Sequence, residues 1–79
     1  MNTNKNVVVG TRYRHYKNQK TYLVLHTALH TETMEQMVVY QGEYEDPELG
    51  KDPIFVRPLN MFIEDVGVEG KKIPRFTAL

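Results

Sequence analysis

The 79-residue chain contains no cysteine and no serine. Without cysteine it can form neither a disulfide nor a thiolate zinc site. Because both residue types are missing, hydrolysis through a serine or cysteine nucleophile is excluded. A chain this short buries only about 60–65% of the surface that its unfolded form exposes. We therefore expect one domain that depends on a compact core, with self-association as a further source of stability.

An excess of charge of one sign is also missing, because 10 Lys and Arg residues balance 10 Asp and Glu residues. The balance is uneven along the chain: residues 1–40 carry five basic and two acidic residues (+3), and residues 41–79 carry five and eight (−3). Domains that bind duplexes usually carry a basic excess, since affinity for phosphates scales with the cations that displace counterions. Neutrality argues against bulk non-specific binding and leaves room for a local basic surface.

Long apolar runs are absent from the N-terminal segment. Its only consecutive apolar residues are the three valines at 7–9. A signal peptide needs an apolar region of about 7–15 residues and a membrane helix about 20. We expect a soluble, cytoplasmic protein with no membrane partner. The predicted organisation is a flexible N-terminus over residues 1–9 and one small domain over residues 10–79.

The first half of the chain has the pattern of three strands. In RYRHYK, residues 12–17, Tyr13 and His15 alternate with Arg12 and Arg14. A polar turn at 18–20 and the β-branched and aromatic run 21–29 complete a predicted hairpin. The third strand is predicted over residues 36–44, with Gly42 as a candidate bulge.

The segment between the second and third strands, residues 30–36, allows two interpretations. Thr33 with Gln36 could form the capping box of a helix. Valines 38 and 39 follow too soon for a helix and favour a strand. We predict a hairpin loop.

The second half continues with short segments. An acidic loop is predicted over 45–53, an edge strand over 54–58 that Pro58 confines, and one helical turn over 59–61. A last strand is expected near Ile73, after a turn at Gly70. The fold prediction is all-β, a small SH3-like open barrel of about five antiparallel strands, with less than about a tenth of residues helical. The expected core residues are Tyr22, Val24, Val39, Phe55, Phe62 and Val66.

The histidines and acidic residues give no metal-site pattern. On a strand, His26 and His30 would lie on one face about 13 Å apart, at about 3.3 Å per residue, which is too far to share one zinc ion. The acidic loop lacks the register of a calcium loop and is interrupted by Pro47. We predict no metal and no cofactor.

Four separated motifs carry a family resemblance: YRHYK at 13–17, HTETMEQMVVY at 30–40, VRPLNMF at 56–62 and PRF at 74–76. Together they resemble the bacterial domain of unknown function 1653, over residues 10–77. The resemblance implies an SH3-like small barrel and brings no known activity. The family typically has a glycine after the HYK element, where this chain has Asn18, which also tolerates a left-handed turn.

A set of polar and aromatic residues forms the candidate binding site. Arginine presents a planar fork that suits carboxylate and phosphate oxygens, and tyrosines beside it offer stacking surfaces. The alternative is that the aromatic residues fill the core and the arginines pair with Glu64, Asp65 or Glu69. The candidate residues are Arg14, His15, Lys17, His30, Glu32, Tyr40, Arg57 and Arg75, with Lys20 as a further cation.

Three classes of function follow from these residues. The first is a non-catalytic binding module for an anionic ligand, nucleic acid or peptide. The second is a partner subunit whose apolar face is covered by another chain; a weak homo-oligomer is a further candidate assembly. The third is a small enzyme using His15, His30 and Glu32 near Arg57; it ranks last because a small barrel encloses little volume for a ligand. The candidate partners are nucleic acid, a nucleotide or a protein.

Overall fold

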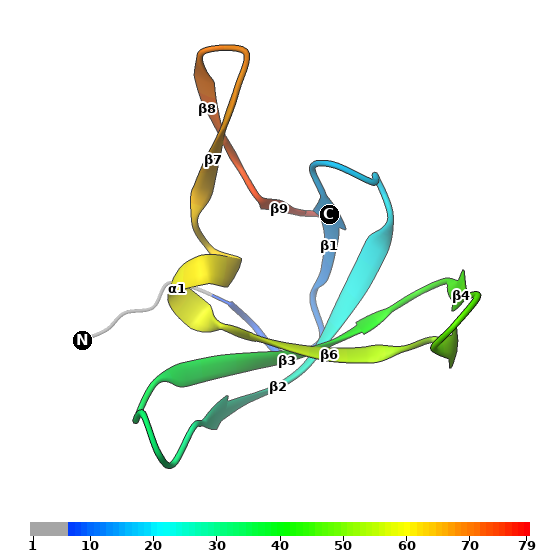
Figure 1. Ribbon diagram of the computed structural model, residues 1–79, viewed down its shortest axis with the longest axis vertical. Coiled ribbons are helices and arrows are strands. Elements are labelled where there is room, and N and C mark those ends of the chain that lie inside the picture. The colour runs from blue at the N-terminus through cyan, green and yellow to red at the C-terminus, as the bar shows by residue number, and fades with distance from the viewer. Residues whose placement is uncertain (1–6) are drawn as a thin grey trace.

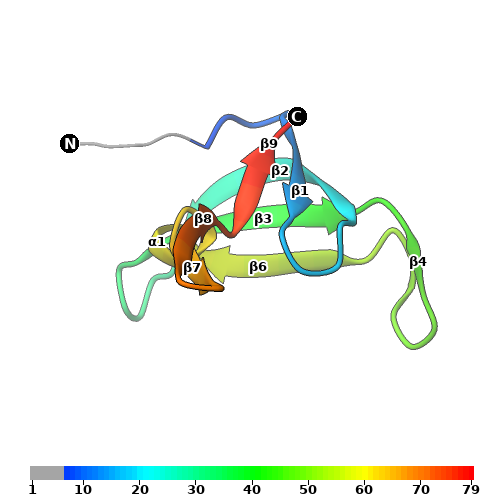
Figure 2. The same cartoon turned by 90° about the horizontal axis from the view of Figure 1, so that it is seen from above.

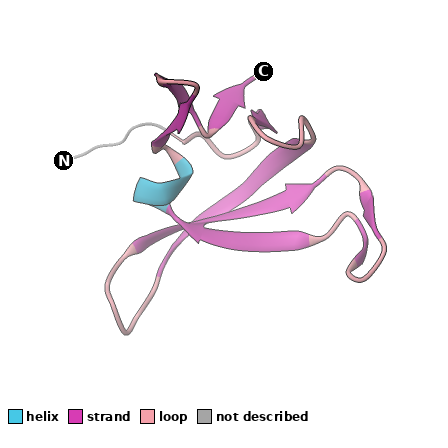
Figure 3. Ribbon diagram, turned by 45° about the horizontal axis from the view of Figure 1, so that its top comes forward, coloured by secondary structure: helices cyan, strands magenta, loops and turns pink. Residues whose placement is uncertain are grey.

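The computed structural model describes residues 7–79 of the chain. In this part the elements are β1 Arg12–His15, β2 Thr21–Leu29, β3 Gln36–Gly42, β4 Glu45–Asp46, β5 Gly50–Lys51, β6 Ile54–Pro58, α1 Leu59–Phe62, β7 Asp65–Val68, β8 Lys71–Pro74 and β9 Phe76–Ala78. Figure 3 shows the short helix among strands and loops. The all-β prediction and its one helical turn are confirmed. With four residues in α1, no helix in the described part of the chain is long enough to cross a membrane.

Five strands form one antiparallel sheet in the order β6-β3-β2-β1-β9. Figure 2 shows β9 and β6 at its two margins. The two margins are not paired with each other, so the sheet is curved and open, not a closed barrel. Two smaller antiparallel pairs, β4–β5 and β7–β8, project away from the sheet (Figure 1). The segment predicted as an acidic loop therefore contains a short ribbon.

The turns that join the first three strands depend on two residues with positive φ. Gln19 has φ 61° in the β1–β2 turn and Met34 has φ 64° in the β2–β3 turn. The left-handed residue is thus Gln19 and not Asn18, whose side-chain oxygen accepts a hydrogen bond from the amide of Lys20 at 2.8 Å. Residues 30–35 form a hairpin loop without helix, as predicted.

The predicted bulge at Gly42 was wrong, because the register shift lies in β2, between Val24 and His26. Gly42 has a different role. A Cβ at this position would lie 2.5 Å from Cε2 of Tyr44. The absence of a side chain at Gly42 therefore allows the Tyr44 ring to lie against the sheet.

One face of the sheet, which we call the inner face, carries the core. Its buried apolar residues are Tyr13, Tyr22, Val24, Val38, Tyr40, Phe62 and Phe76. The predictions for Tyr22, Val24 and Phe62 are confirmed, while Phe55 and Val66 are only half-buried. The prediction for Val39 was wrong: it is half-buried on the opposite face, and its neighbour Val38 is fully buried.

The predicted flexible N-terminus overlaps only slightly with the described chain. Residues 1–6 lie outside the described residues. Val7 is half-buried and packs against the core cluster, and the amide of Gly10 donates to the carbonyl of Val24 at 2.8 Å. Val7 and Gly10 therefore lie against the core cluster and β2.

Candidate functional site

The inner face of the sheet holds a cavity of about 270 Å³ beside the core. Antiparallel partners share a face of a sheet. The register pairs Tyr40 with Phe55, Val38 with Arg57, and His15 with Phe76, so these side chains all extend from the inner face. The lining residues, which we call the aromatic pocket, are His15, Asn18, Tyr22, Tyr40, Tyr44, Asp46, Phe55, Arg57 and Phe76.

Aromatic rings form the walls of the pocket. Tyr22 lies at its centre, with ring centroids 5.5 Å from Tyr40, 5.6 Å from Tyr44 and 5.7 Å from Phe76, each edge to face. The Tyr22 hydroxyl accepts a hydrogen bond from Asn18 Nδ2 at 3.1 Å and shares one with the Tyr44 hydroxyl at 3.2 Å. These contacts hold the rings in fixed orientations. Burial and the hydrogen bond to Tyr22 raise the pKa of Tyr44, so its hydroxyl stays protonated.

Arg57 is the cation of the pocket. Its Nε donates a hydrogen bond to the Tyr40 hydroxyl at 3.2 Å, and its Cζ lies 5.6 Å from the centroid of the Phe76 ring. In residues 7–79 the ion pairs are Arg12 with Glu43 and Arg75 with Glu64, and Arg57 takes part in neither. Arg57 is half-buried as a residue and thus has no carboxylate partner in the described chain.

His15 is held as a neutral donor at the edge of the pocket. Its Nδ1 accepts the amide hydrogen of Lys17 at 3.1 Å, so the proton of the neutral ring lies on Nε2. Burial lowers the pKa of His15, and the positive charges of Arg57, Arg75 and Lys17 lower it further. The pocket therefore gains no second positive charge from His15 at neutral pH.

The lowered pKa of His15 predicts a pH dependence of stability. The unfolded histidine titrates near about 6.5, so below that pH the unfolded chain takes up a proton that the folded chain does not. The free energy of unfolding should fall as the pH decreases from neutral through 6.5, and level off below the pKa of the folded state. Urea denaturation at several pH values in this range would measure it. The free energy of unfolding should change less with pH in His15→Gln than in the wild-type protein. An equal slope in both proteins would contradict the assignment to His15.

Two opposite charges lie at the β4 side of the pocket. The Asp46 carboxylate accepts hydrogen bonds from the amides of Glu48 and Leu49, at 2.8 and 3.0 Å, and these bonds lower its pKa. The Lys20 ammonium lies 4.2 Å from the centroid of the Tyr44 ring. Asp46 lines the pocket together with Arg57, and Lys20 lies beside the Tyr44 ring outside the lining residues.

The structure brings together three of the predicted site residues: His15, Tyr40 and Arg57. Lys17 is exposed in the β1–β2 turn. Arg14 is exposed beside a second cavity that also borders on Gln19 and Thr77. As expected from the alternation in β1, Arg14 lies on the face opposite to Tyr13.

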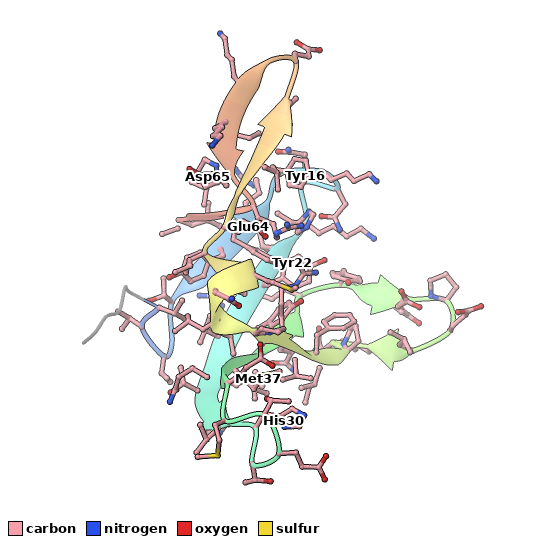
Figure 4. All side chains as sticks on the ribbon, turned by 60° about the vertical axis from the view of Figure 1, so that its left-hand side comes forward. Tyr16, Tyr22, His30, Met37, Glu64 and Asp65 are labelled. Carbon is pink, nitrogen blue, oxygen red and sulfur yellow. The ribbon has the colours of Figure 1, made fainter. Side chains whose placement is uncertain are left out.

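The remaining predicted site residues lie elsewhere. Arg75 pairs with Glu64 at 3.1 Å and donates to the carbonyl of Met61 at 3.1 Å, so it connects the chain after β8 to α1. The Nδ1 atom of His30 accepts the amides of Glu32 and Thr33, at 3.3 and 3.4 Å, within the β2–β3 loop. Figure 4 shows His30 at the opposite end of the sheet from Tyr16. His15, His30 and Glu32 are therefore not assembled into one site.

Several pocket residues were not among the sequence candidates. Tyr22 and Phe55 were predicted as core residues, and the alternation of their strands could have placed them beside Arg57. Tyr44 and Asp46 were expected in a strand end and a solvated loop, and no local signal shows that β4 folds back toward β6. In residues 7–79, no three histidine or acidic side chains lie close enough to hold a metal ion.

Comparisons with known proteins agree with this fold. The model of a family described as protein of unknown function (DUF1653) matches residues 11–78. A crystal structure of a DUF1653 protein from Bordetella bronchiseptica is similar, with a TM-score of 0.78 and 35% sequence identity over 95% of this chain and 90% of that chain. No curated protein matches the sequence. The resemblance read from the four motifs is confirmed, and the chain belongs to the DUF1653 family.

Proposed function

We propose that the domain is a non-catalytic module that binds an anionic ligand in the aromatic pocket. The observation that carries the proposal is the half-buried Arg57, which has no carboxylate partner among residues 7–79. Removing a charge from water is costly unless another group compensates it. A phosphate or carboxylate of a ligand would supply that partner, and a guanidinium fork binds either in bidentate geometry.

The walls of the pocket favour an anion that carries a planar ring. The half-buried Tyr44 and Phe55 line the cavity close to Arg57. Bases of single-stranded nucleic acids stack on such side chains, each worth about 1–3 kcal/mol. The volume of about 270 Å³ lies just below the usual range for ligand pockets, about 300–1,000 Å³, so it fits one base and not a large ligand. A nucleotide or short RNA is therefore the first ligand to test, and an acidic peptide the second.

Net neutrality sets an expectation for affinity. The chain has a formal net charge of zero, and Arg57 and Asp46 are the charged residues that line the pocket. Few phosphates would be neutralised, so the affinity for RNA should be modest and depend only weakly on salt. A steep salt dependence would point to a larger basic surface elsewhere.

Substitution of Arg57 should remove most of the binding. Arg57→Gln keeps a polar side chain and loses the charged fork, and a hydrogen bond to a charged group contributes about 1.5–3 kcal/mol. We expect the dissociation constant to rise by about 10- to 100-fold. Amide chemical-shift titrations with nucleotides, short single-stranded RNA and an acidic peptide would measure it, with shifts expected around residues 15–22 and 55–57.

Two further variants separate the pocket from general electrostatics. Lys72→Gln removes the same charge from the exposed β8 strand and should leave the dissociation constant unchanged. Arg57→Lys keeps the charge without the fork and should give an intermediate value. If none of the three ligands shifts a pocket resonance at millimolar concentration, the proposal is wrong. Equal losses in Arg57→Gln and Lys72→Gln would also contradict it.

A further inference from the structure

The aromatic pocket contains two charges of opposite sign that come from two different strands. Arg57 belongs to β6 and Asp46 to β4, and both line the cavity. Neither takes part in an ion pair among residues 7–79, so the two charges do not neutralise each other by direct contact. A ligand that satisfies the pocket therefore needs one group for the cation and a second group for the anion.

The two strands repeat one arrangement, an aromatic ring followed by a charge. Phe55 and Arg57 are two residues apart in β6, and both line the cavity. Tyr44 and Asp46 are also two residues apart, and the amide of Asp52 donates to the carbonyl of Tyr44 at 2.8 Å, which extends the β4–β5 pairing to Tyr44. Side chains two residues apart on a strand share a face, about 7 Å from each other. A planar group that stacks on either ring therefore has a charged group near its edge.

The Asp46 carboxylate is held in place by the turn that follows it. Its Oδ1 atom accepts the amide hydrogens of Glu48 and Leu49, at 2.8 and 3.0 Å, while its Oδ2 atom accepts no hydrogen bond from residues 7–79. The two bonds lower the pKa of Asp46, so the side chain is ionised at neutral pH. Asp46 thus offers a ligand one negatively charged acceptor atom and no hydrogen to donate.

An ionised acceptor distinguishes the two pyrimidine bases of RNA. Cytosine carries an amino group at position 4, which donates hydrogen bonds, and aspartate side chains accept from it. Uracil carries a carbonyl oxygen at the same position, which only accepts. Beside Oδ2 of Asp46 this carbonyl would place two acceptors together with no hydrogen between them, and a polar group removed from water without a partner is costly.

We propose that Asp46 is a specificity-determining residue of the aromatic pocket, and that it selects cytosine over uracil through the amino group of the base. This inference rests on the proposed function, in which Arg57 binds the anionic group of the ligand. In a pyrimidine nucleotide the phosphate and the 4-amino group lie at opposite ends of the molecule, so Arg57 binds the one and Asp46 the other. The cavity of about 270 Å³ holds the single base that this arrangement requires.

Amide chemical-shift titrations with cytidine and uridine 5′-monophosphate measure the selection, because the two nucleotides differ only at position 4 and the ring nitrogen beside it. The dissociation constant of the uridine nucleotide should be about tenfold higher. Asp46→Asn keeps the Oδ1 acceptor for the turn and replaces Oδ2 by an amide that donates, so the preference should reverse toward uridine. Glu45→Gln removes the same charge from the neighbouring exposed residue of β4 and should keep the preference for cytidine.

The outcomes separate base selection from anion binding and from loss of folding. Equal dissociation constants of the two nucleotides for the wild-type protein would overturn the inference without any variant, and anion binding would stand. Shifts from the acidic peptide alone would have the same meaning. No shift from any of these ligands would contradict the proposed function itself. A cytidine preference that persists in Asp46→Asn, with an unchanged circular dichroism spectrum, would assign the selection to another residue.

Discussion

Val38→Asp should unfold the domain. Val38 is fully buried in β3, 0% exposed, and in the register it lies between Thr27 of β2 and Arg57 of β6. A carboxylate there would be removed from water at a site packed for an aliphatic side chain, while the opposing Arg57 already donates to the Tyr40 hydroxyl and lies over the Phe76 ring. We expect a loss of about 4 kcal/mol or more, against a total stability of roughly 4–12 kcal/mol for a domain of this size. Thermal melting followed by circular dichroism measures it.

Val39→Asp is the matched control, because it makes the same change one residue further along the same strand. Val39 is half-buried on the face of the sheet opposite to the aromatic core, where water reaches its side chain. At low micromolar concentration the variant should melt cooperatively, with a loss of roughly 1 kcal/mol. A folded Val38→Asp together with an unfolded Val39→Asp would show that the register of β3 is wrong.

Phe62→Ala should have the second largest effect on stability. Phe62 is 1% exposed and stacks on Phe76 with ring centroids 4.1 Å apart, and its ring meets Tyr13 and Tyr40 edge to face at 5.3 Å each. Removal of the ring would leave a cavity among three aromatic partners that hydrogen bonds and strand pairing hold in place. The expected loss is about 3–5 kcal/mol, measured by urea denaturation.

Met61→Ala provides the control for the helical turn. Met61 precedes Phe62 in α1 and is 51% exposed. Its truncation should change the free energy of unfolding by no more than about 0.5 kcal/mol. If both alanine variants lost similar stability, the effect would come from the helical turn itself and not from the packing of Phe62 into the aromatic core.

The sequence alone determined the features that depend on local chemistry. Alternation in residues 12–15 placed Tyr13 and His15 on one face of the strand and Arg12 and Arg14 on the other, because successive side chains of a strand point to opposite faces. Proline, glycine and the polar segments marked the turns, and the β-branched run after residue 36 favoured a hairpin loop over a helix in the segment before it. The four family motifs were also sufficient to identify the family. Each strand, turn or motif signal by itself lies within a short stretch of neighbouring residues.

Only the tertiary structure decided which face of an apolar run became the core and which polar residues met. In MVVY both valines suit a strand equally well, and the β2 bulge and the pairing with β6 turned Val38 inward and Val39 outward. Arg75 and Arg57 have the same chemistry in the sequence. Glu64 lies within reach of Arg75, while Arg57 extends from β6 onto aromatic rings of β3 and β9. Such differences arise from long-range strand register, which no short stretch of sequence encodes.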